Sequence, residues 1–115
     1  MVILLDNDDE FRNALAMNLV EDGHHVKQYK RPFDVPPLES LEGVCMLIVD
    51  QHLDQQSGIT FADGFHRVHP SVPVVLITVF ANDHLNAEVT ARDFITLLFK
   101  PIDYENLTRL LTHAR

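Results

Sequence analysis

The sequence predicts an α/β fold, a doubly wound five-stranded parallel sheet with helices on both faces. Short apolar runs alternate with segments of helical periodicity along the chain, and no repeat or low-complexity segment interrupts them. Four of the apolar runs end at a polar residue whose side chain is a carboxylate, a hydroxyl or an ammonium group. These residues are Asp6, Asp50, Thr78 and Lys100. The length of 115 residues, of which 46% are hydrophobic, suits one layered core and therefore one domain, 1–115.

The first elements follow from this alternation. Residues 2–5 form a continuous apolar run, which is typical of a strand buried on both faces. Residues 9–21 carry apolar side chains every four positions and begin with acidic residues, so they predict a helix that ends before Gly23. Residues 25–29 alternate well enough for an edge strand. Three prolines then restrict the next segment to a short helix near residues 37–41.

The middle of the chain repeats the pattern around a long loop. Residues 44–49 predict a second fully buried strand, and the polar residues 50–58 form a loop long enough to shape a site. Phe61, Phe65 and Val68 then follow helical spacing.

The last elements complete five strand and helix units. Residues 74–78 predict a strand, and Asn82 or Asp83 can cap a helix that runs to about Arg92. Residues 95–99 predict the final strand. The last helix has an apolar face at i, i+3, i+4 and i+7, made of Leu107, Leu110, Leu111 and Ala114.

A flavodoxin-like, three-layer arrangement has the strand order 2-1-3-4-5, in which the first and third strands are neighbours. Asp6 and Asp50 would then face each other at the carboxyl edge of the sheet. Thr78 and Lys100 follow the next two strands, so all four side chains are expected around one pocket.

Composition narrows the function further. Seventeen acidic and nine basic residues give a formal charge of −8, and the basic residues are scattered, which argues against direct nucleic-acid contact. Cys45 is the single cysteine and is expected as a buried thiol in a reducing compartment. No apolar run approaches the roughly 20 residues that span a bilayer, and no basic leader follows Met1. We therefore expect a cytoplasmic protein without membrane contact.

Several separated motifs resemble the receiver domain of two-component response regulators (CheY-like), and together they cover essentially the whole chain. They are ILLDND with Arg12 after it, LIVD ending at Asp50 with Ser57-Gly58 downstream, PVVLIT ending at Thr78, and Lys100-Pro101. The resemblance implies a phosphoacceptor switch with intrinsic phosphorylation and dephosphorylation chemistry only, not an enzyme. Its phosphoryl group would come from a histidine kinase, a phosphotransfer protein or a small phosphodonor.

The resemblance also implies roles for individual residues. Asp50 matches the phosphoryl acceptor, Lys100 the lysine that pairs with the acceptor, and Thr78 the hydroxyl that moves to bind a phosphoryl oxygen. The Lys100-Pro101 peptide resembles the cis bond of the family. Because a carboxylate nucleophile must meet an anionic donor, such a site needs positive charge around the transferred group.

Magnesium would supply most of that charge. The matching ligand positions are Asp6, Asn7, Asp50 and the backbone carbonyl of His52. Receivers commonly have two adjacent acidic residues where this chain has Asp6-Asn7, so Mg²⁺ binding is expected to be weakened by the lost charge.

Other positions depart from the family as well. Asp54 replaces the usual proline four residues after the acceptor, and a solvated loop carboxylate is the favoured interpretation. Leu97 stands where a switching Tyr or Phe is common, and Asp93-Phe94 replaces the usual Gly-Ala. Signal output is therefore expected to use the loop after Thr78 and the helix that follows it.

Two alternatives remain open. A degenerate receiver could serve as a phosphorylation-independent interaction or dimerisation module, and the fourth and fifth helices with the fifth strand are the usual pairing surface of the family. A haloacid-dehalogenase-type phosphatase is suggested by the run from Asp6 to Asp8. Glu10 stands where such enzymes need Thr or Val, and 115 residues leave no room for a cap.

Overall fold

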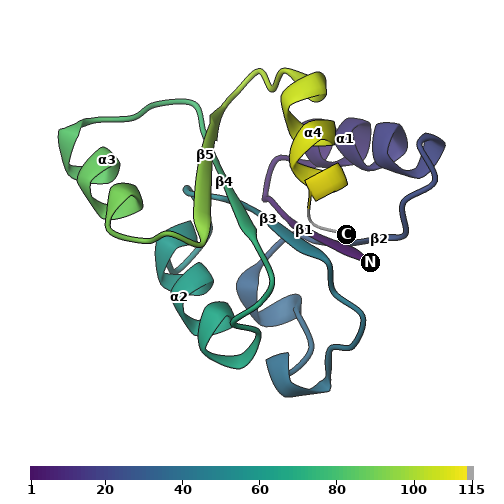
Figure 1. Ribbon diagram of the computed structural model, residues 1–115, viewed down its shortest axis with the longest axis horizontal. Coiled ribbons are helices and arrows are strands. Elements are labelled where there is room, and N and C mark those ends of the chain that lie inside the picture. The colour runs from purple at the N-terminus through teal and green to yellow at the C-terminus, as the bar shows by residue number, and fades with distance from the viewer. Residues whose placement is uncertain (114–115) are drawn as a thin grey trace.

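The computed structural model describes residues 1–113 and contains a five-stranded parallel sheet of order β2-β1-β3-β4-β5 (Figure 1). The strands are β1 (Val2–Leu5), β2 (Val26–Tyr29), β3 (Met46–Asp50), β4 (Val74–Thr78) and β5 (Ile95–Phe99). The predicted strand order is confirmed. Because Leu5 of β1 pairs in register with Val49 of β3, Asp6 and Asp50 come next at the same edge of the sheet.

Helices cover both faces of this sheet, which confirms the predicted three layers (Figure 1). The helices are α1 (Asp9–Glu21), α2 (Gly58–Val68), α3 (Asp83–Thr90) and α4 (Tyr104–His113). Buried side chains of α1 and α4 share one core cluster with one face of the sheet, and those of α2 and α3 share the other. Ala114, expected on the face of the last helix, lies outside the described residues.

The short helix expected near residues 37–41 is present as a 3₁₀ helix, η2 (Leu38–Ser40). A second 3₁₀ helix, η1 (Pro32–Asp34), precedes it in the connection from β2 to β3 and was not predicted. Proline has no N–H to donate and its ring clashes with a preceding helical turn, so three prolines in this segment prevent a continuous α-helix. The part of the chain described here therefore has four α-helices, and the expected fourth and fifth helices correspond to α3 and α4.

The centre of the sheet is completely apolar up to its carboxyl edge. Every residue of β1, β3 and β4 is buried, as the continuous apolar runs predicted. Among the residues of known placement, the buried polar side chains are Asp6, Asp50 and Thr78. Burying a polar or charged group without partners is costly, so these three positions require a specific explanation.

Two further expectations bear on the environment of the protein. Cys45 is only partly buried, because it precedes β3 at the amino edge of the sheet, where the N-terminal amine lies 3.8 Å from its Sγ. None of the helices within residues 1–113 has the length and apolar character needed to traverse a lipid bilayer.

Candidate functional site

Asp6 and Asp50 are held in the same way at the ends of adjacent strands. The backbone N–H of Asp8 donates to Asp6 Oδ1, and that of His52 donates to Asp50 Oδ1, both at 2.8 Å. Each bond joins a carboxylate to the amide two residues further on, which is a local geometry that Asp favours after a strand. Both carboxylates are thereby fixed at one edge of the sheet, with one oxygen each left for another partner.

Lys100 supplies that partner for both carboxylates. Its Nζ lies 2.8 Å from Asp50 Oδ2 and 3.0 Å from Asp6 Oδ2, and its side chain is only 12% exposed. The backbone N–H of Lys100 donates to the carbonyl of Thr78 at 2.9 Å, so the ends of β4 and β5 lie together. The Lys100–Pro101 peptide bond is cis, as the resemblance implied.

Burial and neighbouring charges shift the pKa values of Asp6 and Lys100. Burial raises the pKa of Asp6, and the nearby negative charge of Asp50 raises it further. The hydrogen bond from the Asp8 N–H and the contact with Lys100 lower it. The resulting pKa of Asp6 is about 6. Burial acts against the charged form of Lys100, but the contacts with Asp50 and Asp6 outweigh burial and raise the pKa of Lys100. Asp6 Oδ2 is buried, and its contact with Lys100 Nζ at 3.0 Å is an ion pair without hydrogen-bond geometry.

Thr78 lies at the same edge, but its hydroxyl is occupied by the following turn. Thr78 Oγ1 donates to the carbonyl of Phe80 at 2.6 Å and accepts the Phe80 N–H at 3.2 Å. The structure thus brings Asp6, Asp50 and Lys100 into direct contact, as expected, and places Thr78 in the adjoining strand with its hydroxyl engaged by Phe80.

The loop after β3 is anchored tightly behind Asp50. The N–H of Gly58 donates to the carbonyl of Gln51, and the N–H of Ile59 to the Gln51 side chain. A Cβ at position 58 would collide with the carbonyl oxygen of Asp50 and approach Leu76 Cδ1 to 2.8 Å. Only glycine therefore lets α2 begin so close to the end of β3.

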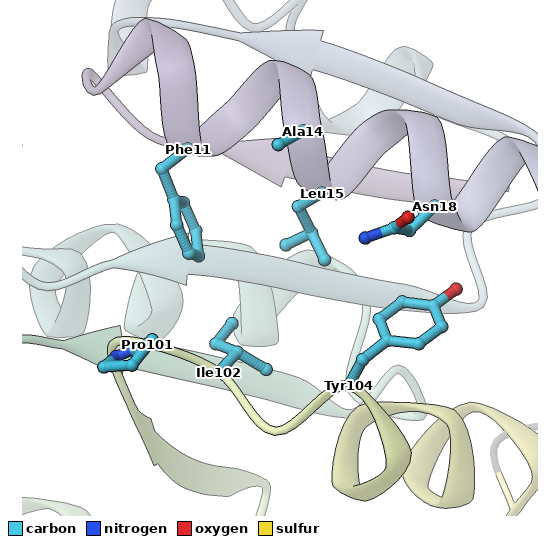
Figure 2. Close-up of a pocket in the computed structure, with 7 residues that line it drawn as sticks. All are labelled: Phe11, Ala14, Leu15, Asn18, Pro101, Ile102 and Tyr104. Carbon is cyan, nitrogen blue, oxygen red and sulfur yellow. The ribbon is translucent and has the colours of Figure 1, made fainter.

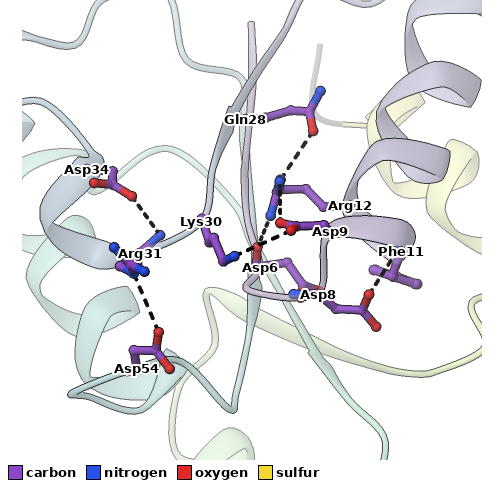
Figure 3. A network of polar contacts seen from close by, with 10 residues as sticks. All are labelled: Asp6, Asp8, Asp9, Phe11, Arg12, Gln28, Lys30, Arg31, Asp34 and Asp54. Carbon is purple, nitrogen blue, oxygen red and sulfur yellow. Dashed lines mark hydrogen bonds and ion pairs between the residues drawn. The ribbon is translucent and has the colours of Figure 1, made fainter.

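Charged side chains surround the rim of the site (Figure 3). Arg12 Nη1 donates to the backbone carbonyl of Asp6 at 2.7 Å, and Asp9 accepts from both Arg12 (2.9 Å) and Lys30 (3.4 Å). The Asp8 side chain accepts the N–H of Phe11 at 3.2 Å and so caps α1, which is the role expected for one of these acidic residues.

Asp54 and Arg31 form a second contact across this rim. Arg31 Nε lies 3.6 Å from Asp54 Oδ2, and both side chains are about half exposed (Figure 3). Asp54 is therefore a solvated loop carboxylate, in agreement with the favoured interpretation. Sequence reasoning missed Lys30 and Arg31, although two basic residues directly after a predicted parallel strand belong at the carboxyl edge of the sheet.

The donor set is compatible with a hard divalent cation. Asp6 and Asp50 offer carboxylate oxygens, and the buried Asp6 Oδ2 makes an ion pair with Lys100 but no hydrogen bond, so it can accept a further partner. Mg²⁺ is commonly bound through one or two carboxylates while it keeps several waters. Within residues 1–113 no group of three or more His, Cys, Asp and Glu side chains is arranged to hold a metal ion.

The family model of the response regulator receiver domain matches residues 2–112. The chain belongs to this family. The transcriptional regulatory protein GlrR of Escherichia coli is 22% identical over 113 residues, which are 98% of this chain and 26% of GlrR. The receiver protein CpdR of Brucella abortus is 24% identical over 106 residues, which are 92% of this chain and 88% of CpdR. The chain spans about a quarter of the length of GlrR and two other curated relatives.

Solved structures agree with this assignment at the level of the fold. The response regulator receiver protein from Pseudomonas putida superposes with a TM-score of 0.87 at 17% identity, covering 97% of this chain and 94% of that one. Receiver domains in general are non-enzymatic phosphoacceptor switches of two-component signalling. They generally bind Mg²⁺ at an acidic pocket and work with histidine kinases or phosphotransfer proteins.

Proposed function

We propose that this receiver accepts a phosphoryl group on Asp50. One Asp50 oxygen would form the new P–O bond while the bond from phosphorus to the donor's imidazole nitrogen or acyl oxygen breaks. The observation that carries the proposal is the buried ion pair of Lys100 with both Asp6 and Asp50. Stability alone does not explain such a cluster, because apolar residues of similar volume would often stabilise the fold equally well.

Asp6, Asn7, Asp50 and the carbonyl of His52 are the positions that would hold Mg²⁺. When bound, the cation would neutralise charge on the phosphoryl oxygens and help to orient the donor. Asn7 offers an amide oxygen in place of a carboxylate, so this chain would bind the cation more weakly than a receiver with an acidic residue there.

Lys100 and Thr78 would then act on the transferred group. Lys100 already lies 2.8 Å from Asp50 and is cationic, so it can donate to a phosphoryl oxygen without a large displacement. Thr78 can donate to a second oxygen only by giving up its bond to the Phe80 carbonyl. Phosphorylation would therefore release the turn after β4, which provides a conformational output without the aromatic residue that Leu97 replaces.

A phosphodonor assay tests the proposal. The protein is incubated with acetyl phosphate and MgCl₂, and its intact mass is measured. We expect the mass of one added phosphoryl group in the parent, its loss in Asp50→Asn, and its retention in the matched control Asp54→Asn. Absence of an adduct in the parent with either acetyl phosphate or phosphoramidate would refute the assignment.

A phosphorylation-independent interaction module is the second candidate. Asn7 and Leu97 favour it, and so do the exposed apolar side chains of Val79, Phe80 and Phe99 at the ends of β4 and β5. Partner binding of equal strength in the parent and in Asp50→Asn would support this candidate. The phosphatase alternative is disfavoured, because the Asp8 carboxylate is used to cap α1.

The proposed partners follow from the same assignment. A histidine kinase or a phosphotransfer protein would deliver the phosphoryl group, and a homodimer would use α3, α4 and β5. We propose that residues 1–115 form one receiver domain, which is supported by the family match over residues 2–112. A cytoplasmic location would suit the free thiol of Cys45.

A further inference from the structure

Phe11 contacts the central lysine of the site from the first turns of α1. Lys100 Nζ lies over the face of the Phe11 ring, 4.2 Å from its centroid. Figure 2 shows the ring pointing from α1 toward the segment after β5, where it lines a cavity of about 190 Å³ together with Pro101 and Ile102. A cation at this distance from an aromatic face is attracted by the negative electrostatic potential of the ring.

We propose that Phe11 is a positioning residue, whose ring holds the Lys100 ammonium between Asp6 and Asp50. An ammonium group has three N–H donors on a flexible stem of four carbons. Two carboxylate oxygens lie at 2.8 and 3.0 Å, and the ring covers a further side of the group. The consequence for phosphoryl transfer rests on the function proposed for Asp50, whereas the placement of Lys100 does not.

The place of the ring is itself well determined. The Asp8 side chain accepts the N–H of Phe11, and the neighbouring Arg12 donates to the carbonyl of Asp6. These two bonds tie the first turns of α1 to the end of β1, which also carries Asp6. The start of α1, which carries the Phe11 ring, is thus connected to the end of β1, which carries the Asp6 carboxylate. Lys100 follows β5 and lies between the ring and that carboxylate. Neither of the two bonds involves Lys100, so the start of α1, which carries the ring, is held independently of the lysine.

Simple packing is the competing explanation, because Phe11 also contacts apolar atoms in the cavity. Fluorine substitution separates the two explanations, since each added fluorine weakens the negative potential of the ring face while changing its size little. We therefore place mono-, di- and trifluorinated phenylalanine at position 11 by amber suppression. The same series at Phe33, an exposed residue of η1, is the matched control.

The first measurement records the Lys100 Hε resonances by NMR at pH 7, with labelled lysine and without a phosphodonor. A lysine held over the ring face at 4.2 Å should have Hε resonances shifted upfield, and Phe11→Leu should remove that shift. We expect the upfield shift to decline stepwise along the series at Phe11, as the weaker ring face releases the ammonium group, and to stay constant along the series at Phe33. Normal Hε shifts in the parent, or an upfield shift that stays constant along the series at Phe11, would overturn the proposal.

The second experiment measures the rate of phosphorylation by acetyl phosphate at saturating Mg²⁺. We expect the rate to fall progressively with fluorination, Phe11→Leu to be several-fold slower than the parent, and Phe11→Tyr to retain most of the rate because it keeps the ring. Equal rates across the series in a phosphorylated protein would overturn the positioning role. If no variant, including the parent, accepts a phosphoryl group while the Lys100 Hε shifts follow fluorination, the function proposed for Asp50 fails and the placement of Lys100 stands.

Discussion

Asp6 shows how a single residue takes its properties from tertiary structure. Its carboxyl group is fully buried beside Asp50, and Lys100 gives it only an ion-pair contact at 3.0 Å. Burial is the largest influence and holds the pKa of Asp6 at about 6, above the usual 3.8. A group with a raised pKa in the folded state binds protons more tightly there than in the unfolded chain, so its ionisation weakens the fold.

The pH dependence of stability tests this environment. Without divalent cations, the free energy of unfolding should gain on the order of 2 kcal/mol from Asp6 as the pH falls from 7 to about 4. This gain begins as the pH falls through about 6, where folded Asp6 takes up a proton, and is complete only below the unfolded pKa of 3.8. Urea denaturation of the parent and of Asp6→Asn in EDTA isolates the contribution of Asp6. Identical pH profiles for the two proteins would show that Asp6 is not perturbed.

Gly58 makes a second prediction at the scale of one residue. Gly58→Ala places a methyl group against the Asp50 carbonyl, so it should lower the free energy of unfolding by about 2 kcal/mol and slow phosphorylation of Asp50. Gly64→Ala is the matched control, because its nearest atom is 3.9 Å away in the same helix. That variant should be neutral or more stable by up to about 1 kcal/mol. Equal stability of the two variants in urea would contradict the close approach of α2 to β3.

At the scale of elements, the turn between β4 and α3 is the segment best placed to report on the site. Thr78 ends β4 in a buried position, and both of its hydroxyl contacts go to Phe80. Val79 and Phe80 are 66% and 65% exposed, and Asn82 then caps α3 by accepting the N–H of Leu85 at 2.8 Å. A change at the Thr78 hydroxyl therefore reaches two exposed apolar side chains directly.

Tryptophan fluorescence can follow this turn, because the chain contains no tryptophan of its own. Phe80→Trp should change its emission when acetyl phosphate and Mg²⁺ are added, since the bonds between position 80 and Thr78 would be released. The change should be lost when Thr78→Val is added to Phe80→Trp, although the adduct on Asp50 still forms. Phe33→Trp, exposed on η1, should show no change. An equal response with and without the Thr78 hydroxyl would exclude this route of output.

At the scale of the whole molecule, the sequence predicted the sheet and the edge that carries the site. The strands were predictable because continuous apolar runs in β1, β3 and β4 reflect burial on both faces. In the connection between β2 and β3, the short helix near residues 37–41 was predictable, whereas its 3₁₀ form and the additional turn η1 were not, since three prolines exclude a long α-helix without specifying which turns replace it.

The site was predictable only in part, for a similar reason. Residues that end strands fall at one edge by topology alone, which gave Asp6, Asp50, Thr78 and Lys100. The orientation of the Thr78 hydroxyl toward Phe80 and the position of Lys100 over Phe11 depend on side-chain packing between segments far apart in the sequence. No local pattern encodes such contacts.

Charge at position 7 gives a prediction for the protein as a whole, whose formal charge is −8. Asn7→Asp should tighten Mg²⁺ binding by about tenfold, because it adds a carboxylate next to Asp6. Asn86→Asp on the exposed face of α3 adds the same net charge away from the site and should change the affinity little. Isothermal titration with MgCl₂ measures both variants. A similar gain in both would show that net charge, and not a ligand at position 7, sets the affinity.

A crystal structure with Mg²⁺ and beryllofluoride, a stable mimic of a bound phosphoryl group, tests the central claim most directly. We predict beryllium bonded to an Asp50 carboxylate oxygen, Mg²⁺ contacting Asp6 and Asp50, and Lys100 Nζ and Thr78 Oγ1 each donating to a fluorine. Beryllofluoride bound at another carboxylate, or Lys100 still bridging Asp6 and Asp50 with no adduct at saturating concentrations, would contradict the assignment of Asp50 as the phosphoryl acceptor.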